Sequence, residues 1–141
     1  MTCTIDLCDA RAVLDFLRSH PDLPGIASLD HNGYANPRDQ RAHHTIQLAD
    51  RSIRAALAWH EVLTDVRIVL DDYNETGSVH IGLYGLLHTG PGVHVYTAVR
   101  GDERTLVRLN TNVTANAHGR RVEVDLLRRL VDAHAAERRV A

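Results

Sequence analysis

The stretch from Ser78 to Arg100, SVHIGLYGLLHTGPGVHVYTAVR, decides the fold that the sequence predicts. Its side chains alternate in polarity at the two-residue period of a half-buried strand, on both sides of a glycine-proline turn. Val79 and Ile81 fall on one side, whereas His80 and Tyr84 fall on the other. The stretch therefore predicts an antiparallel strand pair with one apolar face and one face rich in imidazole and phenol groups.

A further strand over residues 66–73 is joined to this pair by the loop 74–77. A slip of one residue would move every apolar side chain to the wrong face, so the pattern selects one register. In that register Asp71 lies opposite His80, and Arg67 lies opposite Tyr84.

The turn within the pair is predicted over residues 88–92, because only a loop of odd length keeps valines opposite valines. This register places Leu83 opposite Thr97 and Tyr84 opposite Tyr96. The predicted polar face then carries these side chains: Arg67, Asp71, His80, Tyr84, His94, Tyr96 and Arg100.

Hydrophobic periodicity supplies the other elements. Helices are predicted over residues 7–19, 50–63 and about 122–138, and a fourth antiparallel strand over residues 104–109. Short apolar segments over residues 26–29 and 45–48 would extend the sheet. We therefore predict one α+β domain over residues 1–141, in which about three helices cover the apolar face of an antiparallel sheet of four or more strands.

The segment from His31 to His44 is polar and carries the turn signals Asn32-Gly33 and Asn36-Pro37. It is the longest predicted loop before the sheet. Loops of this length often have a functional role.

Composition excludes several classes of function. Net charge is −2 with neutral histidines, so no overall field draws the chain to nucleic acid or to an anionic membrane. The sixteen basic residues are all arginine, which excludes a Schiff-base lysine, Ser-Lys catalysis and a phosphate-binding P-loop. The ten histidines are the unusual feature, because mild acidification would make the chain positive.

The cysteines and the first residues indicate a cytoplasmic protein. Cys3 and Cys8 are the only cysteines and cannot form a disulfide framework. The N-terminal segment has acidic residues where a secretion signal would be basic, and no apolar run reaches the roughly 20 residues that span a membrane.

Two interpretations of the polar face remain open. In the first, it is the contact surface of a non-enzymatic interaction or regulatory module, which binds a protein partner or a second copy of the chain through Arg67, His80, Tyr84, His94, Tyr96 and Arg100. In the second, the chain is a small-molecule-binding domain or a small enzyme. Asp71 would then orient His80 as a general base, and the tyrosines and Arg100 would hold an anionic or aromatic ligand. We favour the first interpretation.

We expect no metal site, no cofactor and no nucleic-acid partner. His80 and His88 are about 27 Å apart along one extended strand, too far to share an ion. His88 with His94 across the turn, joined by His43-His44 from a loop, is a weaker arrangement, and no HExxH motif occurs. The arginines of the last helix share their stripe with Asp125 and Asp132, which neutralise it.

The segment Phe16-Leu17-Arg18-Ser19-His20-Pro21-Asp22-Leu23-Pro24 resembles the opening of small actinobacterial proteins without an assigned function, several of them associated with mobile elements. The resemblance implies a bacterial cytoplasmic protein, and it brings no catalytic residues with it. A role accessory to a mobile element is the corresponding hypothesis.

Overall fold

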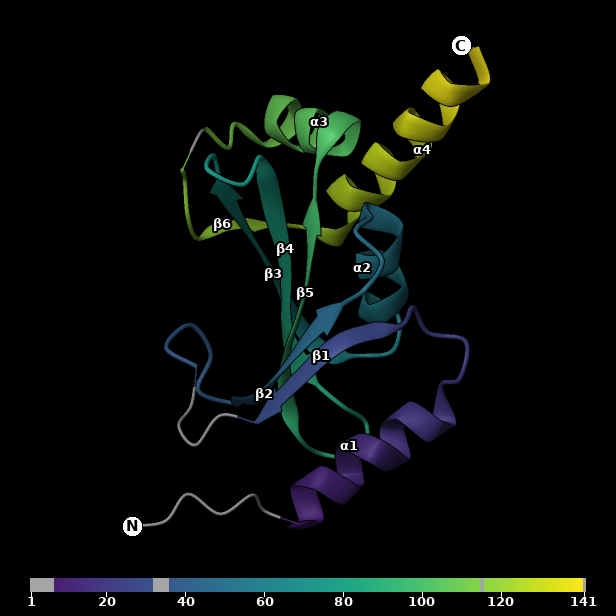
Figure 1. Ribbon diagram of the computed structural model, residues 1–141, viewed down its shortest axis with the longest axis vertical. Coiled ribbons are helices and arrows are strands. Elements are labelled where there is room, and N and C mark those ends of the chain that lie inside the picture. The colour runs from purple at the N-terminus through teal and green to yellow at the C-terminus, as the bar shows by residue number, and fades with distance from the viewer. Residues whose placement is uncertain (1–6, 32–35, 115, 141) are drawn as a thin grey trace.

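In the part of the chain that the computed structural model describes, residues 7–31, 36–114 and 116–140, four helices accompany a six-stranded sheet of order β1-β2-β5-β4-β3-β6 (Figure 1). Cys3 and the predicted turn Asn32-Gly33 lie outside these residues. The elements are α1 Leu7–Ser19, β1 Ile26–His31, β2 Ala42–Leu48, α2 Ile53–His60, β3 Thr64–Tyr73, β4 Ser78–Leu86, β5 Gly92–Val99, α3 Gly101–Thr111, β6 Arg120–Val122 and α4 Val124–Val140.

The predicted α+β class and the β3-β4-β5 meander are confirmed, and the two short apolar segments form β1 and β2. The prediction of a wholly antiparallel sheet is wrong at one place, because β2 pairs with β5 in parallel. Parallel strands need a crossover connection, and α2 supplies it by returning the chain so that β3 runs in the same direction as β2.

The predicted strand over residues 104–109 is instead part of helix α3. The alternation of Val107 and Leu109 looks strand-like, but only Val107 is buried, together with Thr111 one helical turn further on. Asp102 and Glu103 lie in the first turn, where acidic side chains stabilise a helix. This segment therefore follows the helical and not the strand periodicity. The described part of the chain has four helices, against the predicted number of about three.

The register of the β3-β4 hairpin is as predicted, with Asp71 opposite His80. In the β4-β5 hairpin the pairs are shifted by two residues, so that Tyr84 lies opposite His94 instead of Tyr96. The turn occupies residues 87–91, and the N–H of Leu87 donates to the carbonyl of Pro91 at 2.9 Å. A shift of two leaves every side chain on its predicted face.

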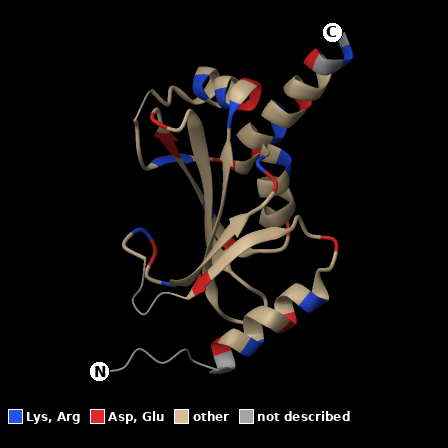
Figure 2. Cartoon of the chain, in the orientation of Figure 1, with Lys and Arg blue, Asp and Glu red and all other residues tan. Residues whose placement is uncertain are grey.

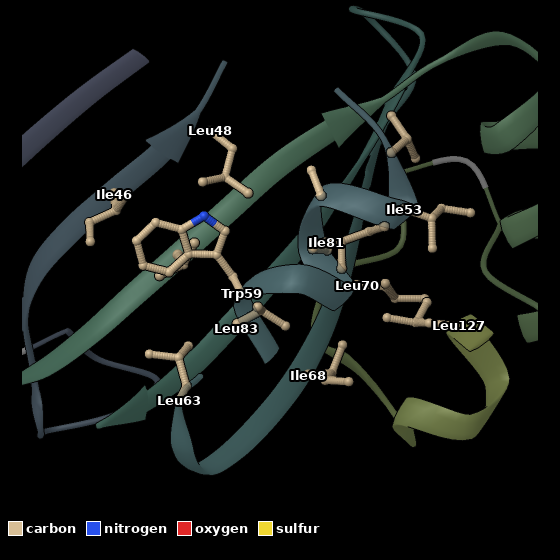
Figure 3. Packing of buried hydrophobic residues seen from close by; sticks show 14 of the residues in the cluster. Ile46, Leu48, Ile53, Trp59, Leu63, Ile68, Leu70, Ile81, Leu83 and Leu127 are labelled. Carbon is tan, nitrogen blue, oxygen red and sulfur yellow. The ribbon is translucent and has the colours of Figure 1, made fainter. Parts of the chain in front are cut away.

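The core lies between the helices and one face of the sheet. Trp59 of α2 is fully buried at its centre among aliphatic side chains of the strands and of α4 (Figure 3). Its ring lies against Phe16 of α1, at 5.9 Å between centroids, and its Nε1 donates to the carbonyl of Pro24. These contacts fix α1 and α2 on the same side of the sheet.

The opposite face of the sheet is free of helices in the described part of the chain. Figure 1 shows α2 and α4 on the right of the sheet and the loop before β2, residues 36–41, on the left. This uncovered side is the imidazole- and phenol-rich face of β3, β4 and β5. None of the described helices combines the length and the apolar character that a membrane crossing requires.

Candidate functional site

A hollow of about 340 Å³ lies on the uncovered face of the sheet. Strands β3, β4 and β5 form its floor, and the start of the 36–41 loop forms one wall. Its lining residues are Asn36, Pro37, Arg38, Asp71, Tyr73, His80, Gly82, Tyr84, His94 and Tyr96.

The floor of the hollow is a continuous ladder of rings. Tyr84 and His94 stack at 4.2 Å between centroids with planes 3° apart, and His94 stacks on Tyr96 at 5.3 Å. Tyr96 stacks on His80 at 5.3 Å, and His80 meets Tyr73 at 4.5 Å. Cross-strand pairing brings these rings together, because Tyr84 is the direct partner of His94. The ladder gives the site an aromatic base.

Gly82 makes room for this ladder between His80 and Tyr84 on β4. A Cβ atom at this position would lie 3.0 Å from Nε2 of His94 and 3.5 Å from the ring of Tyr84. The glycine thus lets the imidazole of His94 lie close over the backbone of β4.

Arg38 and Asp71 form the charged wall of the site. Both terminal nitrogens of Arg38 donate to the carboxylate of Asp71, one of them at 2.7 Å, and the N–H of Gly119 donates to the same carboxylate at 2.8 Å. Burial alone would raise the pKa of Asp71, but these hydrogen bonds outweigh it and hold the pKa below its usual value. Asp71 is therefore an ionised anchor for the loop.

Among the described residues, the hydrogen bonds to Asp71 come from groups other than His80. The two residues are direct cross-strand partners, as predicted. However, the hydrogen bonds that the described residues give to Asp71 come from Arg38 and Gly119, with His118 at 3.6 Å. His80 instead lies between the rings of Tyr73 and Tyr96.

The imidazoles of the ladder are neutral at pH 7. Burial, with a smaller contribution from the nearby Arg38, lowers the pKa of His94 to about 4. Burial also lowers the pKa of His80, while burial raises the pKa values of Tyr84 and Tyr96. The floor thus presents uncharged groups that both donate and accept hydrogen bonds.

The 36–41 loop is held over the sheet by a network of ion pairs. Asp39 is buried and accepts from Arg41 at 2.7 Å and from Arg67 at 2.8 Å. Arg67 also donates to the carbonyl of Arg38, and Arg41 reaches Asp65 at 2.7 Å. Figure 2 shows positively and negatively charged segments beside one another in this loop.

The predicted site residues fall into three places. His80, Tyr84, His94 and Tyr96 line the hollow together. Arg67 lies beside it and holds the loop, and Arg100 precedes α3 outside the lining, where its charge helps burial to lower the pKa of His80.

Sequence reasoning missed Arg38, Tyr73 and His118. Tyr73 has the right alternation on β3 and could have been assigned to the polar face, where it meets His118 at 4.9 Å. Arg38 is in the long loop that was singled out for its length, but no local pattern shows which strand a loop residue reaches. Its partner follows only from the tertiary fold.

The metal arrangements weighed from the sequence are not assembled. His88 meets His20 at 3.0 Å between Nε2 atoms, and His94 is in the ring ladder. Within the described ranges, no three His, Cys, Asp or Glu side chains converge on one point. On α4, Arg128 pairs with Asp125 at 3.0 Å and with Glu61 at 3.2 Å, and charges of both signs follow one another along the helix (Figure 2).

A larger groove of about 750 Å³ borders α3 and the β3-β4 turn. Its lining has no aromatic ring, and the guanidinium of its Arg104 forms an ion pair with Asp72. The smaller hollow has the convergent polar groups and perturbed pKa values that mark binding sites, so we take it as the candidate site.

No family model matches the chain, and comparisons with curated proteins and with solved structures give no significant match.

Proposed function

We propose that this chain is a non-enzymatic binding domain whose hollow takes a small, planar, uncharged aromatic molecule. The observation that carries the proposal is the concave site with the ring ladder as its floor. Aromatic floors favour flat ligands, because offset stacking and edge-to-face contacts add to the burial of apolar surface.

The shape of the site favours a small ligand over a flat protein contact. Ligand pockets typically have volumes of roughly 300–1,000 Å³ and few polar groups, and this hollow falls at the lower end of that range. A protein interface through this face, the interpretation favoured from the sequence, would need the neighbouring loop to be part of the contact. That interpretation stays a prediction.

The electrostatics of the site favour an uncharged ligand. Arg38 is the cation of the lining, and Asp71 already neutralises it through two hydrogen bonds. An anionic ligand would have to compete with a carboxylate for the same guanidinium. A neutral ligand instead finds the donors and acceptors of His80 and Tyr96.

The pKa values favour binding over catalysis. An efficient general base has a pKa near the working pH. Burial lowers the pKa of His94 to about 4, which makes this imidazole a weak base at pH 7. Asp71, the partner that would strengthen His80, is bound by Arg38.

A matched pair of probes tests the proposal. Quinoline and quinoline-2-carboxylate are titrated into the full chain, and the aromatic ring signals of the tyrosines and histidines are followed by NMR. We expect saturable shifts at Tyr96 and His80 with quinoline and at least tenfold weaker binding of the carboxylate. Tyr96→Leu should abolish the shifts, whereas the exposed control Leu109→Ala should leave them unchanged.

Two results would contradict the proposal. One is equal response of the parent and of Tyr96→Leu to quinoline. The other is a concentration-dependent dimer, seen by sizing, that Tyr96→Leu converts to a monomer, because this result would assign the face to self-association.

A further inference from the structure

Two histidine pairs outside the ring ladder have different geometries. In the pair His20 and His88, the Nε2 atoms are 3.0 Å apart and the ring centroids are 5.1 Å apart. In the pair His31 and His44, the Nδ1 atoms are 3.2 Å apart, yet the centroids are only 4.7 Å apart.

The comparison of these distances shows how the rings are directed. When two imidazoles meet end-on to share one N–H, the centroid distance exceeds the nitrogen distance by nearly two ring radii, as in His20 and His88. In His31 and His44 the nitrogens are farther apart while the centroids are closer. The rings of His31 and His44 therefore do not meet end-on, and their planes are inclined at 50°.

The β1-β2 ladder fixes this arrangement, because His31 and His44 are direct cross-strand partners. His44 is 3% exposed, and its ring is held between the sheet and α1. His31 is half-buried at the end of β1.

Asp9 of α1 lies beside His44 at its other ring nitrogen. Its Oδ2 lies 3.7 Å from Nε2 of His44, a buried nitrogen with no hydrogen-bond partner among the described residues. A carboxylate at this nitrogen favours the tautomer with the proton on Nε2, which leaves the lone pair on Nδ1. This carboxylate-histidine relay is the usual support of a metal-bound histidine.

We propose that the Nδ1 atoms of His31 and His44 form a site for a divalent transition-metal ion, with Asp9 as a positioning residue behind His44. Imidazole nitrogens bind Zn²⁺ at about 2.0–2.1 Å, so two cis ligands lie about 3.0–3.4 Å apart, which the observed separation of 3.2 Å matches. Imidazole donors select Zn²⁺, Ni²⁺ and Cu²⁺ over Mg²⁺ and Ca²⁺. Water molecules complete the coordination, so the affinity is below that of a four-ligand structural site.

The test titrates Zn²⁺ and Ni²⁺ into the full chain by calorimetry, in a Cys3→Ser, Cys8→Ser background that removes competing thiols. We expect one bound ion at pH 7, at least tenfold weaker binding in His31→Ala and about tenfold weaker binding in Asp9→Asn. His20→Ala and His88→Ala are the matched controls from the end-on pair, and their affinity should equal that of the parent.

A spectrum of the imidazole nitrogens makes the test independent of folding defects in the variants. In the parent, Zn²⁺ should shift the Nδ1 signals of both His31 and His44, and in Asp9→Asn the His44 shift should shrink. Three results would overturn the site: no binding at 1 mM metal, equal affinity in His31→Ala, or shifts confined to His20 and His88.

Discussion

Asp71 and Asp72 are consecutive residues of β3 that face opposite sides of the sheet, and they show how the two faces differ. On the helix-covered face, Asp72 is fully buried and binds Arg104 at 3.1 Å and the N–H of Asn116 at 3.0 Å. On the uncovered face, Asp71 binds Arg38 and the N–H of Gly119. The chemistry is the same, one carboxylate with one guanidinium and one loop N–H.

The difference lies in the guanidinium. The Arg104 side chain is 16% exposed, whereas the Arg38 side chain is 38% exposed and borders the hollow. The covered face therefore uses its ion pair to hold packed elements together. The uncovered face uses its ion pair to position a loop over a site, where water can replace a lost contact.

The largest expected effect is the difference in stability between the variants Trp59→Ala and Tyr96→Ala. Trp59 is fully buried in the helix-side core, so its removal should lower the free energy of unfolding by about 3–5 kcal/mol. Tyr96 is half-buried on the uncovered face, and its loss should cost less than about 1 kcal/mol. Urea denaturation measures both, and equal losses would contradict the contrast between the faces.

The next largest effect is the difference in stability loss when each of the two carboxylates is replaced by an amide. Asp72→Asn leaves the nearly buried Arg104 without its counter-charge and should cost about 3 kcal/mol. Asp71→Asn should cost about 1–2 kcal/mol, because water can solvate the more exposed Arg38. A double-mutant cycle with Arg104→Met isolates the coupling, and a larger loss in Asp71→Asn would reverse the assignment.

A smaller effect appears in the pH dependence of stability. The folded-state pKa of His94 is about 4 against 6.5 for the free group, so the unfolded chain binds the proton first as pH falls. The stability that comes from keeping His94 neutral is complete above pH 6.5 and is lost progressively as the pH falls toward 4. Urea denaturation from pH 7.5 to 4.5 should show a shallower slope in His94→Asn. The same slope as in the parent would contradict the assignment.

The smallest effect is expected for Gly82→Ala. The new methyl group would meet His94 3.0 Å away, but a side-chain ring can rotate away from it. We expect a change in stability within about 1 kcal/mol and displaced ring signals of His94 and Tyr84. Gly92→Ala is the contrasting variant, because its Cβ would lie 2.0 Å from the carbonyl oxygen of Arg41, and it should be far more destabilising.

From the sequence, the face of the sheet on which each side chain lies could be predicted more reliably than the residue that pairs with it on the next strand. The four-residue loop 74–77 and the strict alternation predicted the β3-β4 register pair by pair. In the next hairpin, the period-2 pattern cannot distinguish registers that differ by two residues, and the turn decides between them. The left-handed φ of +121° at Gly90 and the bond from Leu87 to Pro91 select the observed turn.

Of the candidate site, only the residues of the floor could be predicted from the sequence. Alternation placed His80, Tyr84, His94 and Tyr96 on one face, and the structure brings these four side chains together in the hollow. Its wall depends on where the 36–41 loop lies, which follows from long-range ion pairs such as Asp39 with Arg67. Such pairs leave no periodic signal in the sequence.

The parallel pairing of β2 with β5 has a consequence for the order of folding. The β3-β4-β5 meander forms through short turns, and contacts between neighbouring segments form fastest. In the chain, α2, β3 and β4 lie between β2 and β5. The pairing of β2 with β5 is therefore a contact between distant segments. We therefore expect the meander to assemble first and the β1-β2 hairpin to dock last, as the slow step that completes the sheet.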